Sequence, residues 1–175
     1  MKRIDEILYS LNSLARTGWM LSGVEPCKAE SVSMHSFASA IMALSLSSYI
    51  EGIDPYKATS IALIHDLGES VIGDIARSSN VEKNSAELEA FEKLDINKLI
   101  KDLYKEYRNL SSKEAIVAKI ADLIATYIIA KKYEKEGYDV GEIEASTLKE
   151  LRKMIELNKL EKNVNDFLLA IGVKL

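Results

Sequence analysis

Only two histidines occur in the chain, His35 and His65, and both lie in otherwise apolar stretches with helical spacing. His65 is followed directly by Asp66, and the apolar residues on either side of this pair indicate that it is buried. A buried ionised carboxylate is costly unless it is paired or metal-bound. The pair therefore raises the possibility of a metal site with an imidazole nitrogen and a carboxylate oxygen as ligands. Taken alone, it favours the alternative, a core histidine with its own carboxylate partner.

More carboxylates follow the histidine within a few residues. Glu69 comes four residues after His65, which on a continuing helix places it on the same side one turn later. Gly73 and Asp74 then follow at a loop. Like charges so close together repel one another unless they share a cation. The segment thus favours a cation site over a solvated acidic helix end.

Asp122 is a third candidate, in the middle of a long apolar helical pattern. Aspartate is a poor residue for a helix interior, so it needs a partner there. The small neighbours Ala118 and Ala125 leave room around it. A metal ion and a buried salt bridge, for example to Arg16 or Arg77, remain equal alternatives for that partner.

Together, these residues form a set of two nitrogen and two carboxylate ligands: His35, His65, Asp66 and Asp122. On an octahedral ion such a set leaves positions for a water molecule and a phosphate oxygen. A metal held there would lower the pKa of the water and neutralise phosphoryl charge. We therefore expect one divalent metal ion, and mixed imidazole and carboxylate ligands leave its identity open among Mn, Co, Fe, Zn and Mg.

Helices must position these side chains, because the composition and the spacing of apolar residues favour helix almost throughout. The stretch from Gly18 to Ser33 is expected to be a loop, and residues 111–114 have the form of a capping box. The expected fold is a single all-α bundle of one domain, residues 1–175, with a core at about 4–137 and C-terminal helices at about 138–175. The expected helices cover residues 4–14, 34–44, 55–68, 81–107 (as one or two helices), 112–137, 142–157 and the C-terminus.

Charge and composition exclude several classes of protein. The net charge is −4 without a basic arm, so nucleic-acid binding is not indicated. The single cysteine, Cys27, excludes an internal disulfide and fits a reducing compartment. Residues 31–50 carry no charged side chain, but seven serines and a histidine make a buried helix a better interpretation than a membrane span. The charged N-terminus is unlike a signal peptide, and we expect a cytoplasmic protein without membrane contact.

The order of these residues resembles the HD-domain superfamily of metal phosphohydrolases. The local sequence resembles its 5′-deoxynucleotidase branch, and the last metal-binding helix of that branch fits residues 121–134. The resemblance covers about residues 4–137. The segments that carry it are Arg16–Trp19, Glu30–Ser36, Ala62–Glu69 and Gly73–Ile75.

The resemblance implies a role for each residue. His35, His65, Asp66 and Asp122 would bind the metal, and Glu69 and Asp74 would be catalytic, one acting on the attacking water and the other on the departing 5′-oxygen. Arg16 would bind the phosphate and Trp19 would lie against the sugar and disfavour a 2′-hydroxyl. Arg77, where many members carry proline, would add a second phosphate contact. Without the resemblance, Arg16 and Trp19 would be interpreted as a surface arginine and a core tryptophan.

The implied activity is metal-dependent hydrolysis of the 5′-phosphate of (deoxy)nucleoside monophosphates, a small-molecule substrate. Two alternatives stay open: an HD phosphohydrolase for another phosphoester, such as a nucleoside triphosphate or cyclic nucleotide, and a non-catalytic nucleotide-binding helical module. The resemblance also implies a homodimer, in which the C-terminal helices either cover the core or pair two subunits.

Overall fold

The computed structural model describes residues 1–76 and 83–174, and Arg77, the expected second phosphate contact, lies outside these residues. The described chain is helical and contains no strand, which confirms the expected all-α class. Two isolated bridges join Lys2 to Leu94 and Ala15 to Ser31. The helices are α1 (Ile4–Ser13), α2 (Thr17–Leu21), α3 (Val32–Ser47), α4 (Pro55–Ile64), α5 (Glu69–Ile72), α6 (Lys83–Glu92), α7 (Lys98–Asn109), α8 (Lys113–Lys135), α9 (Gly141–Leu157) and α10 (Glu161–Ala170).

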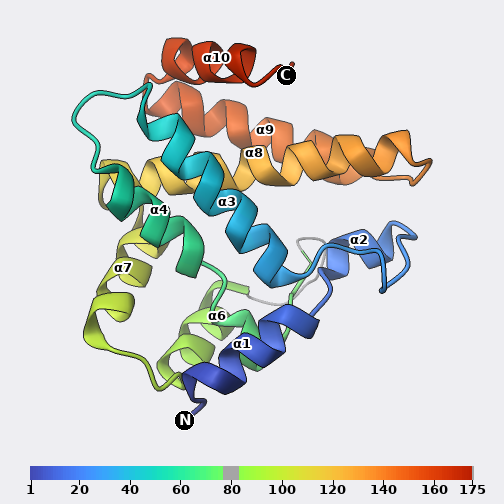
Figure 1. The fold of residues 1–175 in the computed structure, drawn as a ribbon, viewed down its shortest axis with the longest axis vertical. Coiled ribbons are helices and arrows are strands. Elements are labelled where there is room, and N and C mark those ends of the chain that lie inside the picture. The colour runs from blue at the N-terminus through green and yellow to red at the C-terminus, as the bar shows by residue number, and fades with distance from the viewer. Residues whose placement is uncertain (77–82, 175) are drawn as a thin grey trace.

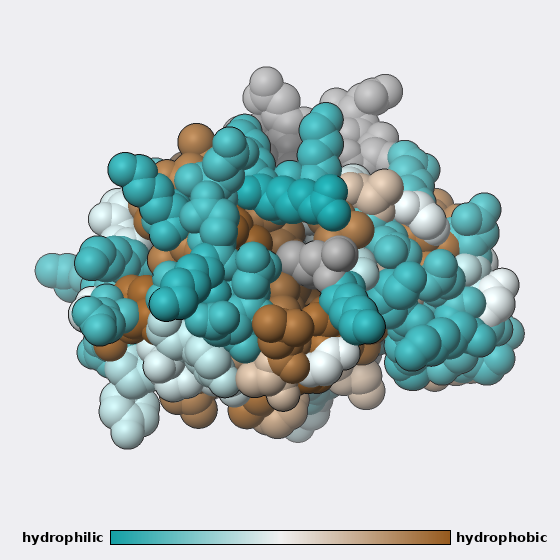
Figure 2. All heavy atoms as spheres, turned by 90° about the horizontal axis from the view of Figure 1, so that it is seen from above, coloured by the Kyte–Doolittle hydropathy of each residue, from teal (hydrophilic) through white to brown (hydrophobic). Residues whose placement is uncertain are grey.

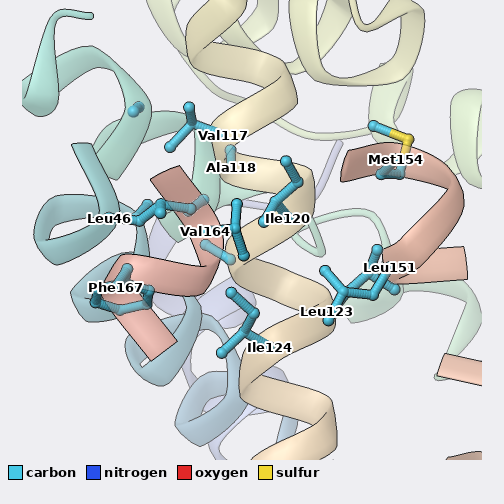
Figure 3. Packing of buried hydrophobic residues seen from close by; sticks show 14 of the residues in the cluster. Leu46, Val117, Ala118, Ile120, Leu123, Ile124, Leu151, Met154, Val164 and Phe167 are labelled. Carbon is cyan, nitrogen blue, oxygen red and sulfur yellow. The ribbon is translucent and has the colours of Figure 1, made fainter. Parts of the chain in front are cut away.

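The long helix α8 is the centre of the molecule (Figure 1). Helices α3, α4 and α9 pack around it. A helix that is apolar on nearly all sides belongs in a core, and the middle of α8 is buried from Ile120 to Tyr127. Helices α9 and α10 add Leu151, Met154, Val164 and Phe167 to the same apolar cluster (Figure 3).

Local sequence signals account for several helix ends. Asp54 accepts hydrogen bonds from the backbone amides of the first turn of α4, and Pro55 is the first residue of that helix. Ser112 caps α8 by accepting from the amide of Ala115 at 3.1 Å. The expected capping box of residues 111–114 is not formed, because the N-cap is Ser112 rather than Ser111, and Glu114 accepts instead from the backbone N–H of Asp54 at 3.1 Å. A tertiary contact therefore takes the glutamate that the local motif would use.

The prediction of a loop from Gly18 to Ser33 is wrong at its start, where the chain forms the short helix α2. Its N-cap, Arg16, makes no side-chain capping bond. The side chain of Asp74 accepts instead from the Thr17 amide, and the Thr17 hydroxyl donates to the Asp74 carbonyl at 2.7 Å. A partner 57 residues away in sequence thus supports the first turn of this helix, and no local pattern indicates it.

The uncharged segment 31–50 forms α3, but the expectation of a buried helix holds for one side only. The other side leaves apolar side chains exposed, and we refer to them as the α3 face: Met34, Phe37, Ile41 and Leu44. None of the helices described is both long and apolar enough to cross a bilayer. Seen from the α10 side, the surface is mainly hydrophilic, with hydrophobic atoms gathered in limited patches near its centre (Figure 2).

Candidate metal centre and pocket

His35 lies on the first turns of α3, which begins after the capping residue Ser31. Its ring is fully buried. The Nε2 atom lies 2.9 Å from Asp122 Oδ1 and 3.4 Å from Ser39 Oγ. The Nδ1 atom is buried and has no hydrogen-bond partner among the residues described. The ring is therefore held by one nitrogen against a carboxylate of α8.

His65 and Asp66 lie in the turn that follows α4. The Nδ1 atom of His65 is 2.7 Å from the carbonyl oxygen of Ala62. Because a carbonyl only accepts, Nδ1 carries the proton, and in a neutral ring the lone pair is on Nε2. This Nε2 faces carboxylate oxygens of Asp66 at 3.1 Å and of Asp122 at 3.9 Å. A lone pair facing two carboxylates needs a proton or a metal cation between them, so the donor set fits a bound metal.

The ligand atoms converge from three elements of the fold. His35, His65 and Asp66 each offer one atom within 4.8 Å of the others. Asp122, from α8, lies beside both imidazoles through Oδ1, while its Oδ2 accepts from Lys119 Nζ at 2.8 Å. The salt bridge that the sequence left open as an alternative for Asp122 is therefore present, but with Lys119 as its partner rather than Arg16, and Arg77 lies outside the described residues. One oxygen of Asp122 pairs with the lysine and the other faces the site.

The charges of the cluster are set by its burial and its neighbours. Burial lowers the pKa of His35, and the nearby Arg16 adds to this. Burial also acts to lower the pKa of His65, but the carboxylates of Asp66 and Asp122 outweigh it and raise this pKa.

Both carboxylates of the cluster are ionised. Burial acts to raise their pKa values, but His65 lowers the pKa of Asp66, while Lys119 and His35 lower that of Asp122. Two carboxylates beside a neutral imidazole make a site that attracts a divalent cation.

A pocket of about 840 Å³ opens beside this cluster. Glu69, 3% exposed, begins α5 at its wall. Gly73, with φ +80°, turns the chain so that Asp74 also lines the pocket. Of the site residues expected from the sequence, the pocket is lined by Arg16, Trp19, His65, Asp66, Glu69, Asp74 and Asp122, whereas His35 lies behind it.

Arg16 and Trp19 are held by a residue to which the sequence assigned no role, Glu30. Its Oε2 accepts from Trp19 Nε1 at 3.2 Å and lies 3.5 Å from Arg16 Nη1. Burial acts to lower the pKa of Arg16, but surrounding carboxylates, Glu30 first among them, raise it above its usual value. Trp19 is 2% exposed and packs edge-on against Tyr133, with ring centroids 5.2 Å apart.

Other pocket residues also escaped the sequence interpretation. Lys119 and Tyr107 both bond to Asp122, and Glu87 pairs with Arg108 at the pocket. Two of the missed residues carried a signal: Glu30 stands in the segment before His35 that resembles the family, and Lys119 stands three residues before Asp122, the spacing of an ion pair within a helix. Helix α9, expected outside the core, lines another part of the pocket with Glu142, Ile143, Ser146, Thr147 and Glu150.

Comparison with known families agrees with this geometry. The profile of the HD domain matches residues 8–162. The chain therefore belongs to the HD domain family, which confirms the resemblance found in the sequence. Membership implies a divalent metal, and the buried histidine and aspartate cluster is where this chain can hold it.

Curated relatives carry the name 5′-deoxynucleotidase. The HDDC2 protein of Bos taurus is 36% identical over 133 residues, which cover 71% of this chain and 63% of that protein. The human HDDC2 protein is 31% identical over 143 residues, which cover 77% of this chain and 68% of that protein. The hdd1 protein of Schizosaccharomyces pombe is 30% identical over 176 residues, covering 93% and 86%. The chain thus matches about two thirds of the length of the two HDDC2 proteins.

Solved structures from two archaea share the fold. A conserved hypothetical protein from Pyrococcus furiosus superposes with a TM-score of 0.82 at 30% identity, covering 97% of this chain and 98% of that one. A protein from Pyrococcus horikoshii gives 0.81 at 34% identity with the same coverage. Both matches extend through the C-terminal helices, since nearly the whole chain is aligned.

Proposed function

We propose that this protein hydrolyses the 5′-phosphate of nucleoside monophosphates, preferring deoxynucleotides, to give nucleoside and phosphate. The observation that carries the proposal is a buried cluster of two imidazoles and two carboxylates beside a pocket that also holds Arg16, Glu69 and Asp74. The name 5′-deoxynucleotidase carried by the relatives supports this choice of substrate. A pocket of about 840 Å³ has room for a nucleotide.

The proposed metal ligands are His35, His65, Asp66 and Asp122. A divalent ion bound there lowers the pKa of a water molecule and neutralises phosphate charge. His65 would present its Nε2, because Nδ1 is engaged with the Ala62 carbonyl. Lys119 holds the far oxygen of Asp122 and so fixes the direction of the near one.

The phosphate is proposed to bind at Arg16, whose guanidinium matches phosphate oxygens in two-point geometry. Arg77 would add a second contact. Trp19 lines the same pocket and is proposed to lie against the sugar, where its ring leaves little space for a 2′-hydroxyl.

Glu69 and Asp74 are the proposed acid and base. Attack of water on phosphorus breaks the bond to the 5′-oxygen, so one group takes a proton from the water and another supplies one to the departing oxygen. Glu69 is buried at the pocket wall beside Asp66, as a base needs to be. Asp74 is engaged by the Thr17 amide, which ties this carboxylate to the segment that carries Arg16.

The decisive experiment measures phosphate release from deoxy- and ribonucleoside 5′-monophosphates after chelation and re-addition of single divalent ions. Metal-dependent release that favours deoxynucleotides is expected. The Asp66→Ala variant should fall to the level of the metal-stripped protein while its circular dichroism stays unchanged. The exposed Asp166→Ala variant, on α10, serves as the matched control.

Two outcomes would overturn the proposal. Full activity of Asp66→Ala after chelation would exclude the metal site as the catalytic centre. Release of pyrophosphate from nucleoside triphosphates, with no release from any monophosphate, would point to a different phosphoester.

We further propose that the chain acts as one domain in a cytoplasmic homodimer. The shared apolar core of α8, α9 and α10 supports the single domain. The α3 face supports the dimer, because its four apolar side chains each keep at least 40% of their surface exposed. The single exposed cysteine, Cys27, fits a reducing compartment.

A further inference from the structure

Glu30 lies in the segment that leads into α3, and its backbone is bonded on both sides. The Arg16 amide donates to the Glu30 carbonyl at 2.9 Å. The Glu30 amide donates to the Tyr133 hydroxyl oxygen at 2.8 Å. The residue is therefore anchored to the beginning of α2 and to the far part of α8, and its side chain is only 5% exposed.

One oxygen of this carboxylate faces groups from three parts of the site. Glu30 Oε2 accepts from Trp19 Nε1 at 3.2 Å and lies 3.5 Å from Arg16 Nη1. It also lies 3.8 Å from His35 Nδ1. Neither Arg16 Nη1 nor His35 Nδ1 has a hydrogen-bond partner in the described chain. Glu30 is thus the carboxylate that both of these buried nitrogens approach.

Stability alone does not explain this arrangement. A buried carboxylate loses its hydration, and replacing a buried ion pair by well-packed apolar side chains is often neutral or stabilising. The indole, the guanidinium and the imidazole that meet at Glu30 are instead the three groups proposed to contact sugar, phosphate and metal. A histidine that binds a metal generally donates its other ring N–H to a carboxylate, which orients the ring.

We propose that Glu30 is a positioning residue that sets the places of Arg16, Trp19 and His35 together. This inference rests on the proposed function of those three residues. The carboxylate holds the guanidinium at the phosphate end of the pocket and the indole at the sugar end. It also accepts from His35 Nδ1–H once Nε2 is engaged by a metal. Glu30 touches neither the substrate nor the metal.

The test uses the only tryptophan of the chain as a probe. Its emission reports on the Trp19 environment directly, without any turnover. Glu30→Gln keeps an oxygen that accepts from the indole but removes the charge, whereas Glu30→Ala removes both. We expect the emission to shift in Glu30→Ala and to stay close to wild type in Glu30→Gln.

Binding of inorganic phosphate and of Mn²⁺, each measured by calorimetry on the intact protein, gives the second readout. Both variants should bind Mn²⁺ about tenfold more weakly, as loss of an outer-shell partner of a metal ligand typically does. Phosphate should also bind more weakly in both, because Arg16 is no longer held at the phosphate end of the pocket. The deoxy-to-ribo ratio of kcat/KM should fall only in Glu30→Ala, since only that variant releases the indole.

Glu25→Gln is the matched control, because Glu25 is an exposed carboxylate in the same loop that bonds to Lys28 and Tyr138 away from the pocket. It should match wild type in all readouts. Unchanged Mn²⁺ and phosphate binding in a folded Glu30→Gln would overturn the positioning role, even if Glu30→Ala does not fold. If the wild-type protein binds Mn²⁺ and phosphate but hydrolyses no monophosphate, the proposed function is refuted. The effect of the Glu30 variants on binding still tests the positioning role in that case.

Discussion

Single residues near the pocket have ionisation properties that follow from burial. Tyr104 is 2% exposed and stacks on Phe91, with ring centroids 3.5 Å apart. Burial, with the charges of Glu87, Asp66 and Glu69, raises its pKa to about 12. The same loss of hydration that makes carboxylates in this region need partners keeps this phenol neutral.

This property predicts how stability changes at alkaline pH. In the unfolded chain a tyrosine ionises near pH 10, so the stabilisation from the raised pKa is complete below pH 10 and is lost between about pH 10 and 12. At pH 11 the loss is about 1 kcal/mol. Tyr104→Phe should remove it, so that the free energies of unfolding in urea at pH 9 and pH 11 differ less than in wild type. Equal pH dependence in the two proteins would show that Tyr104 ionises normally.

At the scale of elements, the turn between α4 and α5 must approach α6 closely. Gly68 stands in this turn between Asp66 and Glu69 with ordinary helical backbone angles, φ −59° and ψ −30°. The backbone conformation at this position therefore does not require a glycine. A Cβ there would lie 3.2 Å from the carbonyl oxygen of Glu87 and 3.9 Å from the Phe91 Cβ. The absence of a side chain at Gly68 lets α6 pack closely against the turn that carries Asp66 and Glu69.

Gly68→Ala is accordingly predicted to force α6 away by a few tenths of an ångström. We expect a loss of about 1 kcal/mol in the free energy of unfolding, as for mild overpacking of a core. Metal-dependent activity should fall as well, because Asp66 and Glu69 flank the site of strain. Gly141→Ala, where the nearest atom to a new Cβ is 3.9 Å away on the Asp139 side chain, is the control. If both variants unfold at the same urea concentration, the contact with α6 is not the reason for the glycine.

At the scale of the whole molecule, the apolar cluster around α8 and the pocket beside the metal-site residues each combine helices that are distant in the sequence. The apolar cluster joins α3 and α4 to α8, α9 and α10. The pocket combines the Arg16–Trp19 segment, the turn after α4, and walls from α8 and α9. Helix α9 therefore contributes to both the core and the pocket and α10 to the core, while the α3 face remains an exposed apolar surface.

The proposed dimer predicts that the α3 face is buried between two copies. In a twofold dimer the same patch meets itself, so one substitution acts on both sides of the interface. One chain has a mass of 19.5 kDa, and sedimentation of the wild-type protein should give twice this mass. Phe37→Glu, at a side chain that is 65% exposed, should give monomers without loss of helicity, because charge repels charge across the axis. Leu169→Glu on α10, 72% exposed, should remain dimeric. A monomeric wild type would refute the dimer, and a dimeric Phe37→Glu would place the interface elsewhere.

The fold class and most of the candidate site could be predicted from the amino-acid sequence. Helical periodicity and local caps such as Asp54 and Ser112 depend on neighbours within a few residues, so they are readable from the chain. The histidines, Asp66 and Asp122 could be grouped because buried polar residues in apolar runs need partners. The family resemblance brought Arg16 and Trp19 to the same site.

Which distant groups satisfy one another depends on the tertiary structure. The hydrogen bond from Tyr107 to Asp122, the capping of α2 by Asp74 and the approach of three nitrogens to Glu30 join residues through packing. The exposure of the α3 face also depends on which side of α3 the other helices cover. Hydrogen bonds and burial between distant segments carry no periodic signal in the sequence, because they depend on how the helices pack in space.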